Sequence, residues 1–365
     1  MGKQRTYGAT GINLKGMPMG ESDRMVTVLT KEHGLVRAIA PGARKHKSRL
    51  AGRSGLFVVN DILLIKGKSI DKLVQAETIQ SFPGLSRDLA KLTASQYLAE
   101  LTLAQALTEQ PQEELYYLLI EHLERIESAS KSNVLACLAQ ATFHLLALAG
   151  VAPEVFRCCL SRVPLSAELG NPDWSVGFSV TSGGAVATEE IEKLECDRLK
   201  EIQQRLAEHQ AERAATAGPL VFESSAQYST GSQNGTGSQN GTGSQNNGSD
   251  TPERQKVLHR LKAQVSKEVS RQLGLVTHLS AAEIALMQQL SKPELVLTST
   301  PTIDALFGSK SGTIKQTAAS QSNDVLSDGP HIMWRHIEKA LRQYAQYQFD
   351  RPIRSAALID TCFSI

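Results

Sequence analysis

The sequence predicts a multidomain α+β protein in which a small five-stranded β-barrel precedes a mainly α-helical domain. The first 82 residues hold five apolar segments of strand length, and glycine-containing turns separate them. From residue 84 onward, leucines recur at spacings of three and four, which is the period of amphipathic helices. A chain of 365 residues is long enough for two or three domains that each bury a core.

Five short strands are expected in the N-terminal part of the chain. They cover residues 6–14, 25–30, 35–40, 56–66 and 73–82. Five strands in so short a segment favour a closed or partly closed barrel, and the oligonucleotide-binding fold (OB-fold) β-barrel has this strand count. Such barrels bind single strands by following phosphates with Lys and Arg while bases stack on aromatic or Arg planes. Phe57 and Phe82 lie within apolar runs, so we expect both in the core.

Helices are expected to dominate the rest of the chain. The leucine spacing predicts three of them within residues 85–107, 115–123 and 134–148, and a charged helix is expected from about 189 to 215. Further helices are predicted at about 253–274, 280–291 and 331–348. Residues 230–249 are a repeat of Gly, Ser, Thr, Gln and Asn with no apolar residue, which predicts a flexible linker or surface loop.

These elements predict a division of the chain into six segments. They are 1–82 (OB-fold nucleic-acid-binding domain), 83–155 (first part of the helical domain), 156–190 (irregular insertion), 191–228 (charged helix and connector), 229–250 (low-complexity flexible loop) and 251–365 (second part of the helical domain).

The distribution of charge is strongly uneven. Residues 1–80 hold fourteen Lys and Arg against six Asp and Glu, a net charge of +8, whereas the other 285 residues hold 25 against 31, a net charge of −6. No Asp or Glu occurs from His33 to Asn60. A local excess of positive charge attracts polyanions, of which nucleic acid is the commonest. The alternative is a solvated basic loop that only keeps the protein soluble.

Several classes of protein are not supported by the sequence. There is no phosphate-binding GxxxxGK[ST] loop, HExxH or GxSxG motif, and His33, His46 and His144 are far apart. We expect His144 to be a hydrogen-bonded core residue, because it lies in an apolar helix. Five scattered cysteines and the lack of an apolar signal core or membrane-spanning run predict a reducing, cytoplasmic environment without a membrane partner.

Two stretches of the sequence resemble a known family. They are GMPMGESDRMVTVLTKEHGLVRAIAPGARKHKSR (16–49) and KGKSIDKLVQAETIQSFPGLSRDL (66–89). Both are similar to the N-terminal part of the bacterial recombination mediator RecO. SQYLAEL (95–101), LLALAGVAPEVFRC (145–158) and the ending RQYAQYQFDRPIRSAALI are similar to the helical domain and C-terminal helix of that family. The GESDR and GARKHKSR combination is the most specific part of the resemblance.

The resemblance implies a non-enzymatic DNA repair and recombination mediator in the bacterial cytoplasm, associated with the nucleoid. Such a protein binds single- and double-stranded DNA, anneals complementary strands, and acts with RecR to load RecA onto strands coated by the single-stranded-DNA-binding protein (SSB). The expected DNA-binding residues are Arg37, Arg44, Lys45, Lys47, Arg49, Arg53, Lys66 and Lys68. Arg24 has Glu21 and Asp23 beside it as possible partners, and a structural role for the GESDR turn is at least as plausible as DNA contact.

One departure from the family concerns zinc. Many relatives carry two Cys-x-x-Cys pairs, whose positions here correspond to Cys158, Ser161, Ala187 and Glu190. Zinc sites of this kind need four Cys or His ligands, so we expect a degenerate zinc-finger-like insertion that holds no metal, and no cofactor elsewhere. Cys158 is the remaining cysteine of that set.

The resemblance also implies a protein partner for the helical domain. In the family, the helical domain binds the acidic and apolar C-terminal tail of SSB, which requires an apolar pocket with a basic rim. Candidate rim residues are Arg254, Arg260, Lys262, Arg271, Arg335, Lys339 and Arg342. Two other functions stay open: an OB-fold RNA-binding or translation-associated factor, and a non-catalytic protein adapter. Salt-sensitive binding separates the adapter from the other two, and preference for RNA over DNA favours the second function.

Overall fold

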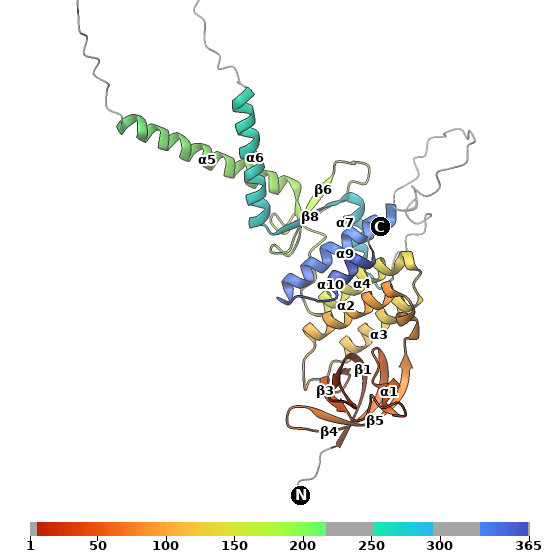
Figure 1. Cartoon of the computed structure of the whole chain (residues 1–365). Coiled ribbons are helices and arrows are strands. Elements are labelled where there is room, and N and C mark those ends of the chain that lie inside the picture. Colours follow the sequence, from red (N-terminus) through yellow and green to blue (C-terminus); the bar gives the residue numbers. More distant parts are fainter. Residues whose placement is uncertain (1–5, 217–251, 295–328, 364–365) are drawn as a thin grey trace, which may run out of the picture. The chain divides into compact units, whose positions relative to one another are not determined.

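The computed structural model describes residues 6–216, 252–294 and 329–363 (Figure 1). Contacts divide the chain into two compact units. The first comprises Met1–Thr188 and Leu273–Ile365, and the second is Glu189–Gln272. The β-barrel and the main helical body therefore belong to one unit, and two long charged helices account for the described residues of the other. The six-segment division stays a prediction.

The N-terminal part of the first unit is a closed barrel of five strands. They are β1 (Thr6–Met19), β2 (Asp23–Thr30), β3 (Gly34–Ala40), β4 (Val58–Ile65) and β5 (Asp71–Ser81), in the order β1-β2-β3-β5-β4. Neighbours are antiparallel, except that β3 and β5 pair in parallel. A short helix, α1 (Leu50–Arg53), connects β3 to β4. The predicted strand count and closure are confirmed.

Alternation along the strands fills the barrel. Val26 and Val28 on β2 and Leu64 on β4 are almost completely buried, whereas Thr27 between the two valines is half-exposed and Leu63 before Leu64 is exposed. At one end, Ile12, Phe57 and other apolar side chains belong to the same core cluster as the helical body. The barrel is therefore fixed to the helices through apolar packing.

Gly34 lies where the barrel meets the helices. Its φ is +64°, and a Cβ atom there would lie 2.2 Å from the Leu107 carbonyl oxygen. The next amide, that of Leu35, donates to the same oxygen at 2.8 Å, and the Gln112 amide donates to the Lys31 carbonyl at 2.9 Å. Only glycine permits both this backbone conformation and so close an approach.

The helical body of the first unit surrounds one apolar helix. It contains η1 (Pro83–Arg87), α2 (Leu89–Gln105), α3 (Glu113–Ser128), η2 (Lys131–Asn133), α4 (Val134–Leu148), α9 (Gly329–Gln348) and α10 (Ala356–Cys362). Asp88 caps α2 by accepting from the Ala90 amide at 2.8 Å. Helix α4 is buried on nearly all sides because α2, α3 and α9 contact it. The helices predicted at 85–107, 115–123, 134–148 and 331–348 are confirmed.

The segment 156–190, predicted to be irregular, carries a β-hairpin. Strands β6 (Ser175–Ser179) and β7 (Gly184–Ala187) pair, and β8 (Leu275–Ser280), from a distant part of the sequence, completes a sheet of order β7-β6-β8. The expectation of an irregular structure was therefore wrong for the two strands, whereas residues 156–174 form no helix or strand. Short strands whose partner lies almost a hundred residues away leave little local signal. Helix α7 (Ala281–Gln289) follows β8 at once and confirms the helix predicted near 280–291.

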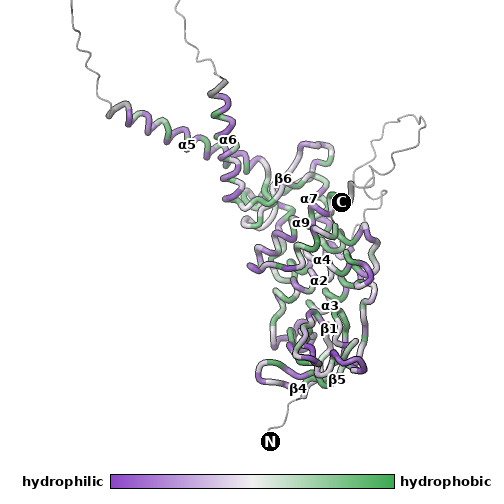
Figure 2. Tube along the Cα trace, in the orientation of Figure 1, coloured by the Kyte–Doolittle hydropathy of each residue, from purple (hydrophilic) through white to green (hydrophobic). Residues whose placement is uncertain are grey.

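The second unit consists mainly of α5 (Thr188–Thr216) and α6 (Pro252–Gln272). Both are predominantly hydrophilic along their length (Figure 2). They confirm the helices predicted at about 189–215 and 253–274. The predicted low-complexity loop at 229–250 lies outside the described residues. None of the described helices combines the length and the apolar character needed to cross a bilayer.

Candidate nucleic-acid interface

The basic loop, defined here as residues 43–53, leaves the barrel between β3 and β4. Arg44, Lys45, Lys47 and Arg49 are exposed on it, and Arg53 is half-buried. Within the described parts of the chain, no carboxylate forms an ion pair with any of these five side chains. Their charges are therefore available to a solvent-borne anion.

The start of the basic loop is fixed to the turn between β1 and β2. Asp23 Oδ1 accepts from the Gly42 amide at 2.8 Å, and the Ser22 carbonyl accepts from the Arg44 amide at 2.9 Å. The Arg44 guanidinium also donates to the Gly20 carbonyl at 2.7 Å. The Gly42 hydrogen bond, followed by that of Ser22, lowers the pKa of Asp23. Asp23 therefore stays ionised and holds the loop at its first residues.

The end of the basic loop is fixed by two buried amides of the barrel. Asn13 on β1 donates from Nδ2 to the Arg53 carbonyl at 2.7 Å and to the Gly55 carbonyl at 2.9 Å. Asn60 on β4 donates to the same Arg53 carbonyl at 2.9 Å. Both asparagines are at most 3% exposed. The chain then enters β4 through Phe57, whose φ of +58° is unusual for a large side chain.

Arg24 is part of this scaffold and is not paired with its acidic neighbours. Its Nη1 atom donates to the Ser54 carbonyl at 3.1 Å and to Ser54 Oγ at 3.2 Å. The GESDR turn, residues 20–24, thus contacts both ends of the basic loop. Sequence reasoning missed the holding roles of Asp23, Asn13 and Asn60. The bonds of Asp23 and Asn13 span 19 to 42 residues and leave no local pattern, and the bond from Asn60 to Arg53 spans 7 residues.

A cavity of about 690 Å³ adjoins the loop. Arg24 and Arg44 line it together with apolar side chains that include Leu56 and Phe82. Leu56 is 42% exposed, whereas Phe82 is 5% exposed and Phe57 is 3% exposed. The prediction that both phenylalanines belong to the core is confirmed.

Arg37 and Lys66 line a different cavity, of about 640 Å³. Lys66 forms an ion pair with Glu109 at 2.9 Å, and Asp71 in the same wall accepts a hydrogen bond from the Tyr7 hydroxyl. Burial, together with this bond, raises the pKa of Tyr7. The carboxylates make this cavity less favourable for phosphate than the basic loop. Lys68 is exposed.

At the position expected to lack zinc, hydrogen bonds surround Cys158. Cys158 is buried, and its sulfur accepts from the Ala187 amide at 3.3 Å. Burial acts to raise the pKa of the Cys158 thiol, but hydrogen bonds from Ser161, Ala187 and Leu160 outweigh it and lower the pKa. No cluster of three or more His, Cys, Asp or Glu suited to a metal occurs among the residues that the structure describes. The zinc-finger-like character of the insertion is not seen.

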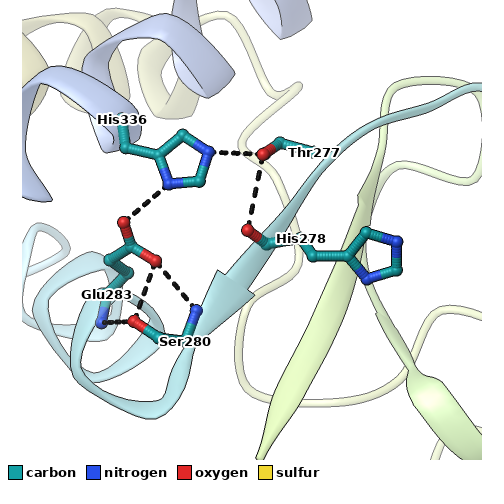
Figure 3. A network of polar contacts seen from close by, with 5 residues as sticks. All are labelled: Thr277, His278, Ser280, Glu283 and His336. Carbon is teal, nitrogen blue, oxygen red and sulfur yellow. Dashed lines mark hydrogen bonds and ion pairs between the residues drawn. The ribbon is translucent and has the colours of Figure 1, made fainter. Parts of the chain in front are cut away.

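A polar network joins α9 to β8 and α7 (Figure 3). His336 Nδ1 lies 2.6 Å from Glu283 Oε1, and His336 Nε2 bonds to Thr277 Oγ1. Glu283 also caps α7 by accepting from the Ser280 amide at 2.8 Å. The His278 ring points away from these groups (Figure 3). The Glu283 hydrogen bond raises the pKa of His336, and the network holds three elements together.

Two further groups bear on the sequence predictions. His144 Nε2 bonds to the Leu290 carbonyl at 2.7 Å, and its Nδ1 lies 3.1 Å from His122 Nε2. The predicted hydrogen-bonded role of His144 is confirmed, and its side chain is half-buried. Arg342 was a candidate for the rim of a tail-binding pocket, and this was wrong, because its side chain is 8% exposed and bonded to Glu338 and Asp360.

These features define a class of protein with a cationic β-barrel head and a helical body. Family models for Recombination protein O match the chain, with the N-terminal model over residues 4–82 and the C-terminal model over residues 86–214. The chain is 44% identical to the DNA repair protein RecO of Nostoc sp., covering 99% of this chain and 97% of that protein.

Other relatives give the same picture. Identity to the DNA repair protein RecO of Gloeothece citriformis is 44%, over 98% of this chain and 97% of the relative. Identity to the DNA repair protein RecO of Acaryochloris marina is 42%, over 99% of this chain and 96% of the relative. The chain therefore belongs to the RecO family, and its role lies in DNA repair and recombination.

Proposed function

We propose that the chain binds single- and double-stranded DNA through the basic loop, anneals complementary strands, and helps RecR load RecA onto SSB-coated single strands. The proposed action involves no covalent chemistry. The observation that carries this proposal is a loop with five unpaired cations that the barrel holds at both ends. The names of the relatives, each a DNA repair protein RecO, support it.

Annealing is first a problem of charge. Two phosphate backbones repel each other until cations on a protein surface neutralise part of both. Each phosphate contact contributes about −0.9 to the slope of log K against log salt concentration on duplex DNA and about −0.7 on single strands. Because hydrogen bonds already fix the loop, less conformational entropy is lost on binding. The assigned contacts are Arg44, Lys45, Lys47, Arg49 and Arg53.

Arg37, Lys66 and Lys68 extend the proposed DNA track with smaller contributions. Lys66 must leave Glu109 or share its charge with it, since the two are 2.9 Å apart. Surface pairs of this kind are worth about 0 to 1 kcal/mol, so exchange with a phosphate is feasible. Changing these three residues should weaken DNA binding less than changing the loop.

A candidate SSB-tail site lies in the first unit. A cavity of about 610 Å³ is lined by the apolar residues Leu14, Leu56 and Leu103 and by three cations, Lys15, Arg351 and Arg354. All three cations are exposed. An apolar floor with a basic rim suits a tail that is acidic and apolar. We assign this cavity to the SSB tail, and Arg351→Ala with Arg354→Ala should weaken capture of a tail peptide without changing binding to naked DNA.

The deciding experiment compares annealing of SSB-coated complementary strands by the intact chain and by a variant with the five loop residues changed to Ala. The intact chain should anneal, and the variant should bind DNA weakly while keeping its circular-dichroism spectrum. A folded variant with unchanged annealing would refute the assignment. RecR-dependent delivery of RecA to the same coated strands is the second readout.

Asp23 offers a sharper test of whether the loop must be held. Asp23→Asn and Asp23→Ala both remove one negative charge, but only Asn keeps an oxygen that can accept from the Gly42 amide. Attraction by net charge alone predicts tighter DNA binding in both variants. If positioning matters, Asp23→Ala should bind DNA more weakly than Asp23→Asn. Equal affinities would show that holding the loop contributes nothing.

The alternatives give different results. An RNA-binding factor would prefer RNA over DNA of the same sequence, through contacts to the 2′-hydroxyl. A protein adapter would show no steep loss of nucleic-acid affinity as salt rises. The family membership favours the DNA reading over both.

A further inference from the structure

The acidic part of the chain contains one strongly basic helix. Helix α6 (Pro252–Gln272) carries six Lys and Arg against two Asp and Glu, a net charge of +4. Helix α5 (Thr188–Thr216) in the same unit has five against eight, a net charge of −3. The net charge of −6 outside the N-terminal 80 residues therefore hides a cationic element.

The cations of α6 are concentrated on one face. Lys256, Arg260, Lys267 and Arg271 fall within an arc of about 60° at 3.6 residues per turn. They extend along about 22 Å of the helix axis at 1.5 Å per residue. All four are exposed. We call this set the α6 stripe.

Small or polar residues border one side of the stripe, and Gln264 and the exposed Val257 border the other. His259, Ala263 and Ser270 lie on one side of it. The apolar residues occupy the opposite face, where Val265 is 1% exposed and Val269 is 4% exposed. The stripe is thus separate from the packing face of its helix.

The four cations have no competing partner among the residues that the structure describes. Helix α6 has two acidic residues: Glu253 precedes Lys256 by three residues, and Glu268 is bonded to Arg198 of α5 at 2.7 Å. Elsewhere on α5, Arg198 also holds Glu201 and Lys200 holds Asp197. These three carboxylates are therefore held by cations of α5, and no ion pair to the four stripe cations occurs among the described residues.

We propose that the α6 stripe is a second nucleic-acid-binding surface, which contacts the phosphate backbone independently of the basic loop. One strand of a duplex has a phosphate about every 3.4 Å along the axis, so the stripe spans about six phosphates. A straight, convex row of point charges matches a regular polyanion. The apolar residues Val265 and Val269 on the opposite face are buried, so they are not free to insert into a lipid surface, where an interfacial helix buries its apolar face. A chain with two such surfaces can hold two strands at once, which annealing requires.

The stripe rests on its own residues, and the test separates it from the proposed function. Four full-length proteins are compared: the intact chain, the five-residue loop variant, a stripe variant (Lys256→Ala, Arg260→Ala, Lys267→Ala, Arg271→Ala), and the two sets combined. Binding to a thymidine 30-mer is measured by fluorescence anisotropy across a salt series. Alanine favours helix, so α6 should persist, and circular dichroism checks this.

The stripe variant should show a salt slope shallower by up to about 2.8, from about 0.7 for each of four contacts on a single strand. It should also lose the ability to capture a second labelled strand on an immobilised first one. A matched pair of single variants on the same helix provides the control. Lys262→Ala removes a cation that lies off the stripe, and Lys267→Ala removes one that belongs to it. Only the second should reduce the salt slope.

Three results would overturn the inference: an unchanged salt slope in the stripe variant, equal effects of Lys262→Ala and Lys267→Ala, or stripe-dependent binding to phosphatidylglycerol vesicles without any to DNA. If the loop variant binds normally and the stripe variant does not, the proposed loop function fails and the inference stands. If only the loop variant loses binding, the proposed loop function stands and the stripe inference fails.

Discussion

Removing Arg342 should expose how α9 and α10 are held together. Arg342 Nε lies 2.9 Å from Glu338 Oε1, Nη2 lies 2.6 Å from Asp360 Oδ1, and Nη1 donates to the Ala356 carbonyl at 2.9 Å. The side chains of Arg342 and Glu338 are 8% and 3% exposed, whereas that of Asp360 is 56% exposed. Arg342→Met keeps the aliphatic length and removes every one of these donors.

The magnitude depends on the carboxyl that is left behind. Removing one member of a buried pair costs about 3 to 5 kcal/mol, because the other charge is then buried without a partner. Burial already raises the pKa of Glu338 to about 7 with Arg342 present. A carboxyl whose pKa is higher in the folded state than in the unfolded state destabilises the fold as pH rises. The loss in Arg342→Met should therefore be largest near pH 8 and smaller at pH 5, where Glu338 takes up a proton.

Urea unfolding at pH 8 and pH 5 measures these losses, and a second variant isolates their cause. Arg342→Met combined with Glu338→Leu replaces the pair by apolar side chains, which is often close to neutral. The double variant should regain most of the stability lost at pH 8. If it is as unstable as Arg342→Met alone, the loss comes from packing or from the Ala356 carbonyl, and the argument from an unpaired Glu338 is refuted.

Three other predictions concern stability. Burial and the neighbouring His144 lower the pKa of His122 to about 3, so below about pH 6.5 the unfolded chain binds a proton that the folded chain does not. The free energy of unfolding should therefore fall by at most about 2 kcal/mol from pH 7 to pH 5. A urea midpoint that stays constant over this range would contradict the prediction. The raised pKa of His336 stabilises the fold below about pH 6.5, and this contribution is lost as pH rises through the pKa of the folded state. The difference in urea midpoint between the intact chain and His336→Gln should therefore shrink from pH 6 to pH 9. A difference that stays constant would argue against the His336 contact. Gly34→Ala should lower the melting temperature more than Gly20→Ala. Both glycines have positive φ, but only at Gly34 would a Cβ atom meet backbone oxygen. Equal losses of melting temperature would show that the close approach at Gly34 does not matter.

Local pattern was sufficient to predict most elements of the fold. The alternation in strands such as β2 and the leucine period of α2 to α4 reflect burial of one face, which sequence records directly. Strand β8 was missed, because Leu275–Ser280 follows α6 closely and pairs with β6 across about a hundred residues. The same reason hid the His336 and Glu283 contact, whose members lie 53 residues apart.

The candidate site was only partly readable from the sequence. Charge and exposure of Arg44 to Arg49 follow from a run of cations without acids, because such residues are rarely buried. The pairing of Lys66 with Glu109 was not predictable, since Glu109 lies 43 residues further along the chain. The burial of Arg342 was also not predictable. The buried face of an amphipathic helix normally carries apolar residues, and a charged residue lies there only when a partner charge is present, as Glu338 is here.

The structure gives a physical reason for the joint occurrence of the GESDR and GARKHKSR stretches. Asp23 in the first accepts from Gly42 in the second, and Arg24 in the first reaches Ser54 just beyond the loop. Each stretch therefore needs the other: without the turn the cations lose their support, and without the loop the turn has unpaired polar groups. The carboxylate of Asp23 is directed toward the backbone of the loop and not toward its cations. Under the proposed function, Asp23 therefore adds a negative charge to the basic head and still favours DNA binding, because it holds the loop in place.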